Sequence, residues 1–278
     1  MIPDDVFTRV LVGTDGSPRA EEAVRQSARL ASATGVPMEI AFVIDTGRPH
    51  EGNVELEAET ALQRAAAVAA EAGVEGDVRI LAGDPAKTLM SEAEEEGADL
   101  IGVGPDAGLL GGAIQNEQTA ARVLAEARYS VLVARPATPD FPARIACAVD
   151  GSETSAGTAA LAAGLASATG AELRLVHVIP VFRGDNSEWT LGEGEPSPPE
   201  LEPAVEAALA RAVQPVREMA MGRPENALLE AASRNGTDLL VVGYRGVRGV
   251  RKVLLGSVSE HTAHHARCSV LVARVRSA

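Results

Sequence analysis

The chain contains few aromatic residues and few cysteines. Phenylalanine, tyrosine and tryptophan together make up 3% of its 278 residues. This scarcity excludes a core built on stacked rings and favours one of alanine, valine, isoleucine and leucine. Its two cysteines, Cys147 and Cys268, lie far apart, one inside an apolar segment and the other just before one. They predict reduced, packed thiols, with a redox pair as the alternative.

Long apolar runs and excess positive charge are also missing. No apolar run approaches the roughly 18 residues of a membrane-spanning helix. The segment Met1-Ile-Pro-Asp-Asp5 lacks the basic and apolar regions of a signal peptide. Lysine and arginine number 25 against 39 acidic residues, giving a net charge of −14. We therefore expect a cytoplasmic protein whose main partner is neither nucleic acid nor a membrane.

The sequence contains an internal repeat with a constant offset of 139 residues, as from Gly104 to Gly243. The repeated segments are Ala98-Asp-Leu-Ile-Gly-Val-Gly104 with Thr237-Asp-Leu-Leu-Val-Val-Gly243, and Ser130-Val-Leu-Val-Ala-Arg135 with Ser269-Val-Leu-Val-Ala-Arg274. The repeat predicts two domains, 1–138 and 142–278. The segment Pro136–Pro142 contains three prolines and is the predicted linker.

Each half begins with an apolar run that ends in Asp-Gly-Ser, at Asp15 and at Asp150. Such runs, bounded by turn residues and lacking alternation, predict strands buried on both faces. Helical segments that end at Gly35 and Gly170 follow them. The further expected strands are Met38–Ile44, Asp77–Ala82, Glu172–Ile179 and Val216–Met221, and the further expected helices are Val54–Ala72 and Glu200–Ala212. The Gly/Pro/Glu-rich segment Arg183–Pro199 is expected to be a mobile connection.

Alternating strands and helices predict an α/β fold: two tandem Rossmann-like domains, each a doubly wound parallel sheet of about five strands. Ligands bind such sheets beyond the carboxyl ends of the strands, where the strand order reverses. Asp150 ends the first strand of the second half, and Gly243 ends the fourth. If these two strands are neighbours, both residues open onto one crevice.

A glycine-rich loop follows the fourth strand of the second half. It reads Gly243-Tyr-Arg-Gly246, then nine residues, then Gly256-Ser257. The glycines allow close approach of the backbone to a ligand, and the helix predicted after Gly256 has free amides that favour an anion. The loop has no acidic residue up to Ser259, and its cations are Arg245, Arg248, Arg251 and Lys252. The pattern indicates a polyphosphate site, with a solvated helix face as the alternative.

The corresponding loop of the first half has lost this pattern. At the same offset, Ala107 stands for Gly246, Glu117 for Gly256 and Gln118 for Ser257. Glu117 would place a carboxylate where phosphates would lie. We therefore predict that the first half does not hold ATP in the way expected of the second half, and that it is either a structural partner or a site for an uncharged ligand.

Two further motifs need interpretation. The carboxylate of Asp150 suits a ribose hydroxyl or an adenine amino group, but a turn or helix-capping role would explain it equally. His261 and His265 lie four residues apart, as in some metal pairs, yet no further ligand occurs at a fitting spacing. We predict no metal held by protein ligands there. No Gly-Lys-Ser/Thr sequence is present, which excludes a P-loop.

The chain resembles the universal stress protein family in its tandem, two-domain form. Nucleotide-binding members carry Gly-x2-Gly-x9-Gly-Ser/Thr after the fourth strand, and the second half matches at every position. The resemblance implies domains of the adenine nucleotide alpha hydrolase-like type. It implies that Asp150 contacts the adenosine, that the backbone of Val178 holds the adenine, and that the phosphates lie on Gly243, Gly246, Gly256 and Ser257. We expect Mg²⁺ to come with the triphosphate rather than from a cage of protein ligands. Arg245 is the loop cation that we add to this site.

The family also pairs through its last strand, which corresponds here to Val131–Ala134 and Val270–Ala273. Pairing of the two domains would cover both apolar edges, and a homodimer is a further possibility. We expect a stress-response protein that binds ATP in its C-terminal domain and acts as a nucleotide-dependent regulator or signalling module rather than an enzyme. The alternatives are an interaction scaffold that ignores nucleotide and a slow ATPase, although no general base is evident beside the loop.

Overall fold

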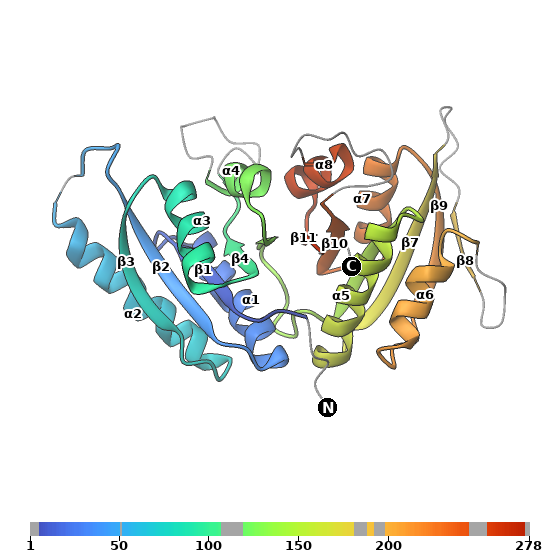
Figure 1. The fold of residues 1–278 in the computed structure, drawn as a ribbon, viewed down its shortest axis with the longest axis horizontal. Helices are drawn as coiled ribbons and strands as arrows, with labels where there is room; N and C mark the ends of the chain where they lie inside the picture. The colour runs from blue at the N-terminus through green and yellow to red at the C-terminus, as the bar shows by residue number, and fades with distance from the viewer. Residues whose placement is uncertain are drawn as a thin grey trace. The chain divides into compact units, whose positions relative to one another are not determined.

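The computed structural model describes residues 6–50, 52–106, 119–180, 188–191, 198–244 and 255–275. The chain divides into two compact units. The N-terminal unit comprises Phe7–Pro136, and the C-terminal unit comprises Met1–Val6 together with Ala137–Ala278. In each unit, helices cover the faces of a twisted sheet (Figure 1).

The N-terminal unit alternates strands and helices throughout its described residues. The elements are β1 (Val10–Thr14), α1 (Pro18–Thr34), β2 (Met38–Asp45), α2 (Val54–Glu71), β3 (Asp77–Gly83), α3 (Pro85–Glu96), β4 (Leu100–Val103), α4 (Thr119–Glu126) and β5 (Ser130–Val133). The strands are parallel and lie in the order β3-β2-β1-β4-β5. This arrangement confirms the predicted doubly wound sheet of five strands.

The C-terminal unit repeats this arrangement with one addition. Its elements are β6 (Arg144–Val149), α5 (Glu153–Thr169), β7 (Glu172–Pro180), β8 (Glu188–Leu191), α6 (Glu202–Leu209), β9 (Val216–Gly222), α7 (Pro224–Arg234), β10 (Leu239–Gly243), α8 (Ser257–His265) and β11 (Ser269–Ala273). The order is β11-β10-β6-β7-β9-β8. The extra strand, β8, runs antiparallel to β9 inside the segment expected to be a mobile connection. Its sequence, Glu-Trp-Thr-Leu, includes good strand formers, and these outweigh the surrounding glycines and prolines.

Burial explains why the strand segments lack alternation. Every residue of β4, β5 and β11 is buried, as expected for strands covered by helices on both faces. Cys147 in β6 is fully buried, and burial raises the pKa of its thiol to about 12. Both cysteines are free thiols, but Cys268 is partly exposed, so only Cys147 is packed as predicted.

Helix ends follow the residues that the sequence offers. Ser17 and Ser152 cap α1 and α5, each accepting a hydrogen bond from an amide three residues on. Gly35 and Gly170 end these helices with φ of 71° and 76°, the left-handed conformation that favours glycine. These glycine stops confirm the prediction.

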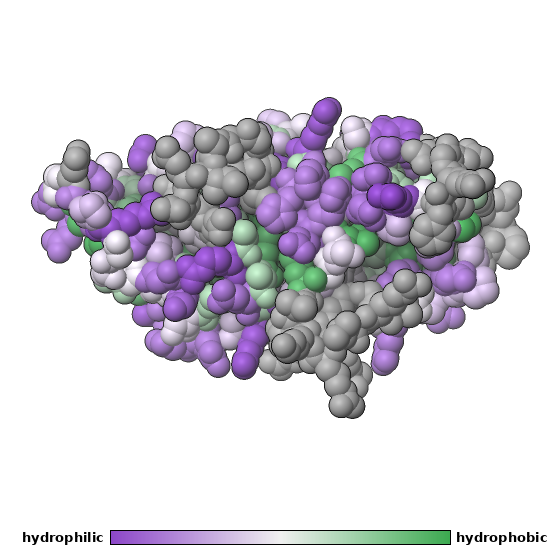
Figure 2. Space-filling model, turned by 90° about the horizontal axis from the view of Figure 1, so that it is seen from above, coloured by the Kyte–Doolittle hydropathy of each residue, from purple (hydrophilic) through white to green (hydrophobic). Residues whose placement is uncertain are grey.

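Hydrophilic side chains predominate on the face seen in Figure 2, in keeping with the acidic composition. Among the described helices, none combines the length and the apolar character needed to cross a membrane.

Candidate functional site

The strands that carry Asp150 and Gly243 are neighbours. β6 and β10 pair in parallel, with Ile145 opposite Leu239 and Cys147 opposite Val241. The chain continues outward from β6 to β7 and from β10 to β11, so the strand order reverses between β6 and β10. Their carboxyl ends therefore form the switch point at which such sheets bind ligands.

Asp150 shapes the turn that leads from β6 into α5. Its Oδ1 atom accepts hydrogen bonds from the Ser152 amide at 3.0 Å and from the Ser152 hydroxyl at 2.6 Å. The Ser152 Oγ atom accepts in turn from the Ser155 amide at 3.2 Å. The turn role considered for Asp150 is thus present. Because the residue is also exposed, this role is compatible with contact to a ligand.

Val178 lies where β7 extends beyond β6. The last residue pair of these two strands joins Val149 to His177, and Val178 is the next residue along β7. The ring nitrogen Nδ1 of His177 lies 2.9 Å from the Val149 carbonyl oxygen and so holds the end of β6 in place. The backbone of Val178 consequently lies at the same edge of the sheet as Asp150.

A short set of hydrogen bonds joins the end of β10 to the start of α8. The Ser259 hydroxyl donates to the Gly243 carbonyl at 2.5 Å. The Gly256 amide donates to the Tyr244 carbonyl at 2.9 Å, and the Tyr244 amide donates to the Ala273 carbonyl at 2.9 Å. Gly256 is therefore beside β10, but its own amide is engaged within the protein. The donors left at the start of α8 begin with Ser257.

Two of the predicted site residues, Arg245 and Gly246, lie outside the described residues. On either side of that segment the chain is anchored. Tyr244 is 7% exposed, and the guanidinium of Arg274 lies 3.2 Å from the centre of its ring. Gly256 precedes the first turn of α8 and offers no side-chain cap to it. Asp150, Val178, Gly243, Gly256 and Ser257 all lie around the carboxyl ends of β6, β7 and β10.

The corresponding helix of the N-terminal unit, α4, holds a carboxylate of its own. One carboxylate oxygen of Asp106 accepts from the Ala120 amide at 3.0 Å, and the other accepts from the Ala121 amide at 2.9 Å. The sequence prediction assigned this negative charge to Glu117, which lies outside the described residues. Asp106 was missed because the two amides that it binds lie 14 and 15 residues later in the chain. The repeat offset is the available signal, since it sets Asp106 against Arg245.

A cavity of about 860 Å³ lies at the carboxyl ends of β1, β2 and β4 in the N-terminal unit, and Asp106 lines it. Two of the cations around it are paired with carboxylates that also line it. Arg122 Nη1 lies 2.7 Å from Asp84 Oδ2, and this hydrogen bond lowers the pKa of Asp84. Arg48 Nε lies 3.1 Å from Asp45 Oδ2. The cavity therefore has carboxylates beside two of its arginines, and Arg19 lines it as well.

Comparison with known proteins shows which protein family the chain matches. The family model described as "Universal stress protein family" matches residues 7–135 and 143–274. A universal stress protein of Thermus aquaticus is 35% identical over 147 residues, which is 47% of this chain and 97% of the relative. Among five of the curated relatives, the matched share of their own length runs from 34% to 97%.

A solved structure that matches nearly the whole chain shows the same fold. A universal stress protein from Archaeoglobus fulgidus DSM 4304 superimposes with a TM-score of 0.70 at 20% identity, over 97% of this chain and 96% of that one. A shorter universal stress protein from Archaeoglobus fulgidus, solved in complex with dAMP, is 26% identical over 47% of this chain and 97% of its own, with a TM-score of 0.37. With two matched segments that cover nearly its whole length, the chain belongs to the universal stress protein family.

Proposed function

We propose that the protein binds ATP in its C-terminal unit and acts in the cytoplasm as a nucleotide-dependent regulator or signalling module of the stress response. The observation that carries this proposal is the contrast between α4 and α8. The first amides of α4 are bound to Asp106, whereas α8 begins at Gly256 without a side-chain cap. A helix start that lacks an internal acceptor favours an anion.

In the proposed complex, each element supplies one part of the ligand's surroundings. Asp150 accepts hydrogen bonds from the adenosine, and the backbone of Val178 holds the adenine edge. The triphosphate lies on Gly243, Gly246 and Gly256-Ser257, and Arg245 adds positive charge from the same loop. The divalent metal, Mg²⁺, enters with the triphosphate rather than being held by a cage of protein ligands.

We propose regulation rather than catalysis for this site. Asp150 is committed to the turn before α5 and to the adenosine, and the sequence offers no evident general base beside the loop. Binding changes the conformation of the loop Tyr244–Leu255, and another protein reads that change. The predicted pairing of the two domains through 131–134 and 270–273, and a homodimer, stay predictions that belong to this proposal.

Isothermal titration calorimetry of nucleotide-free protein with MgATP tests the proposal. Gly256→Glu introduces the residue that the first half carries at the equivalent position, and we expect it to abolish ATP binding without unfolding the protein. Asp150→Ala should weaken binding by about tenfold or more, because the loss of one charge-assisted hydrogen bond costs about 1.5–3 kcal/mol. Asp15→Ala is the matched control, since Asp15 forms the same turn before α1, and it should leave the affinity unchanged.

The outcomes separate the alternatives. Unchanged affinity in Gly256→Glu would show that the site is elsewhere. Absence of binding at millimolar ATP would favour the nucleotide-independent scaffold. Steady ATP turnover above background that disappears in Gly256→Glu would favour the slow ATPase.

A further inference from the structure

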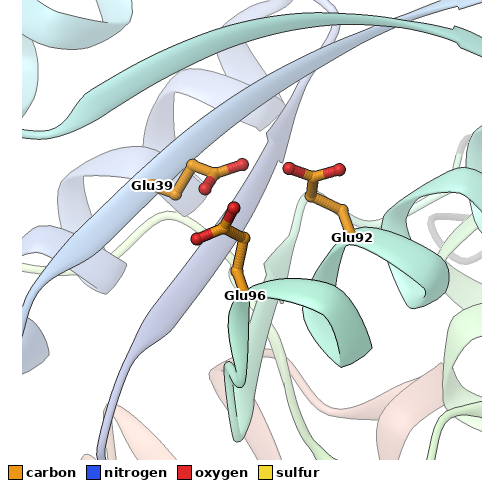
Figure 3. Close-up of side chains that lie close together, drawn as sticks. All are labelled: Glu39, Glu92 and Glu96. Carbon is orange, nitrogen blue, oxygen red and sulfur yellow. The ribbon is translucent and has the colours of Figure 1, made fainter.

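Three carboxylates converge in the N-terminal unit, at the opposite end of the sheet from the cavity. Glu39 comes from the start of β2, and Glu92 and Glu96 come from successive turns of α3 (Figure 3). One oxygen from each lies within 4.8 Å of the others. Figure 3 shows the three carboxyl groups pointing toward one another.

Two of these carboxylates are buried, and most of their oxygens lack hydrogen bonds. The side chain of Glu39 is 1% exposed, and neither of its oxygens has a hydrogen-bond partner. The side chain of Glu92 is 8% exposed, and its Oε1 atom has an ion-pair contact with Arg79 Nη1 at 3.2 Å but no hydrogen bond of good geometry. A buried carboxylate without hydrogen bonds is unfavourable unless a positive charge compensates it.

Arg79 supplies only part of that compensation. Its guanidinium lies 2.7 Å from Glu96, 3.2 Å from Glu92 and 3.7 Å from Glu39. Arg79 therefore faces all three carboxylates, and its closest contact is with the most exposed of them, Glu96, which Arg9 also contacts at 3.7 Å. The Arg79 side chain is 47% exposed, so its long stem is free to turn toward solvent.

At the equivalent position in the C-terminal unit, the acidic and basic residues of the two strands are exchanged. By strand register, Arg174 on β7 stands where Glu39 stands on β2, and Glu218 on β9 stands where Arg79 stands on β3. Glu218 accepts hydrogen bonds from Arg174 at 3.2 Å, Arg234 at 3.2 Å and Asn235 at 2.9 Å. There a single buried carboxylate has three donors. In the N-terminal unit all three carboxylates contact Arg79, and Arg9 contacts only Glu96, at 3.7 Å.

We propose that Glu39, Glu92 and Glu96 form a binding site for a hard divalent cation. The cluster presents carboxylate oxygens, the ligand type that suits Mg²⁺, Ca²⁺ and Mn²⁺. A cation bound between the three groups replaces Arg79 as the central positive charge and compensates both oxygens of Glu39. This site is separate from the Mg²⁺ that accompanies ATP, and it does not depend on the proposed function.

A proton partly fulfils the same role in the metal-free protein. Burial, and after it the neighbouring Glu92 carboxyl, raise the pKa of Glu39 to about 7.

The test uses the full, nucleotide-free chain after treatment with EDTA, with Mn²⁺ as the probe. Electron paramagnetic resonance measures free Mn²⁺ during titration, and thermal unfolding is followed with and without the metal. We expect saturable binding of Mn²⁺ and a rise in Tm. Glu39→Gln and Glu92→Gln should each weaken binding at least tenfold. Neither should lower the Tm of the metal-free protein, because each removes a buried charge.

The control is Glu94→Gln, which neutralises an exposed residue on the same helix and should keep the wild-type affinity. No saturable binding of Mn²⁺ would overturn the proposal, and it would leave a shared proton as the compensating charge. Equal weakening in Glu94→Gln would overturn it as well, because the response would then reflect surface charge alone.

Discussion

At the scale of single residues, Asp106 accounts for the difference between the two helix starts. Both of its carboxylate oxygens are bound to amides in the first turn of α4. The charge also lies near the positive end of the helix dipole, where a carboxylate is stabilising. Asp106 therefore accepts the hydrogen bonds from these amides that a bound phosphate would otherwise accept.

Replacing Asp106 should destabilise the N-terminal unit. We expect Asp106→Ala to lower its free energy of unfolding by about 1 kcal/mol, the usual cost of losing a capping side chain. Asp106→Asn should cost less, because the amide oxygen still accepts one hydrogen bond. Urea unfolding followed by circular dichroism measures both values. An Asp106→Ala variant as stable as the wild type would show that this carboxylate does not support α4.

At the scale of elements, the strand β9 and the helix α7 are joined through one buried carboxylate. Glu218 is 2% exposed and holds Arg174 of β7, Arg234 of α7 and Asn235, which follows α7. The equivalent elements of the N-terminal unit, β3 and α3, meet at the cluster of Glu39, Glu92 and Glu96. The same place in the fold thus carries opposite arrangements of charge in the two units.

Removal of Glu218 should therefore be costly, in contrast to removal of Glu39. We expect Glu218→Ala to lower the free energy of unfolding of the C-terminal unit by about 3 kcal/mol, since one partner of a buried ion pair is lost. Glu39→Gln in metal-free protein should leave the N-terminal unit at least as stable as before. Urea denaturation of both variants gives the comparison, and equal losses would contradict the difference in hydrogen bonding described here.

At the scale of the whole molecule, the two units share a fold but differ in their helix starts, so nucleotide should act on them unequally. We expect ATP to slow amide hydrogen exchange in the C-terminal unit around α8, and to leave the exchange of α4 unchanged. Mass spectrometry of peptic fragments measures this difference, and Gly256→Glu should remove the protection. Protection centred on α4 would contradict the assignment of the site to the C-terminal unit.

Sequence was sufficient for features that depend on neighbouring residues. The buried strand that ends at Asp150 and the glycine stop at Gly170 both follow from local patterns, and both are confirmed. The adjacency of β6 and β10 entered the sequence analysis only as a condition, and the structure shows that the two strands pair.

Features that join distant segments of the chain could not be predicted from local sequence patterns. Asp106 reaches amides far along the chain, and Glu39 meets Glu92 only because β2 packs beside α3. The strand β8 was missed for another reason, since its four residues lie in a segment dominated by glycine, proline and glutamate. In each case the folded arrangement, rather than the local composition, determines the role of the residue.

The carboxylate that binds the start of α4 is part of the chain itself, and this affects how α4 responds to anions in solution. A tethered group competes at an effective concentration set by the chain itself, commonly in the millimolar range or above for short linkers, and dilution does not reduce it. Inorganic phosphate or sulfate in the cell would have to displace this resident anion before reaching α4. The start of α4 is thereby protected from competing anions, whereas no described side chain caps the start of α8.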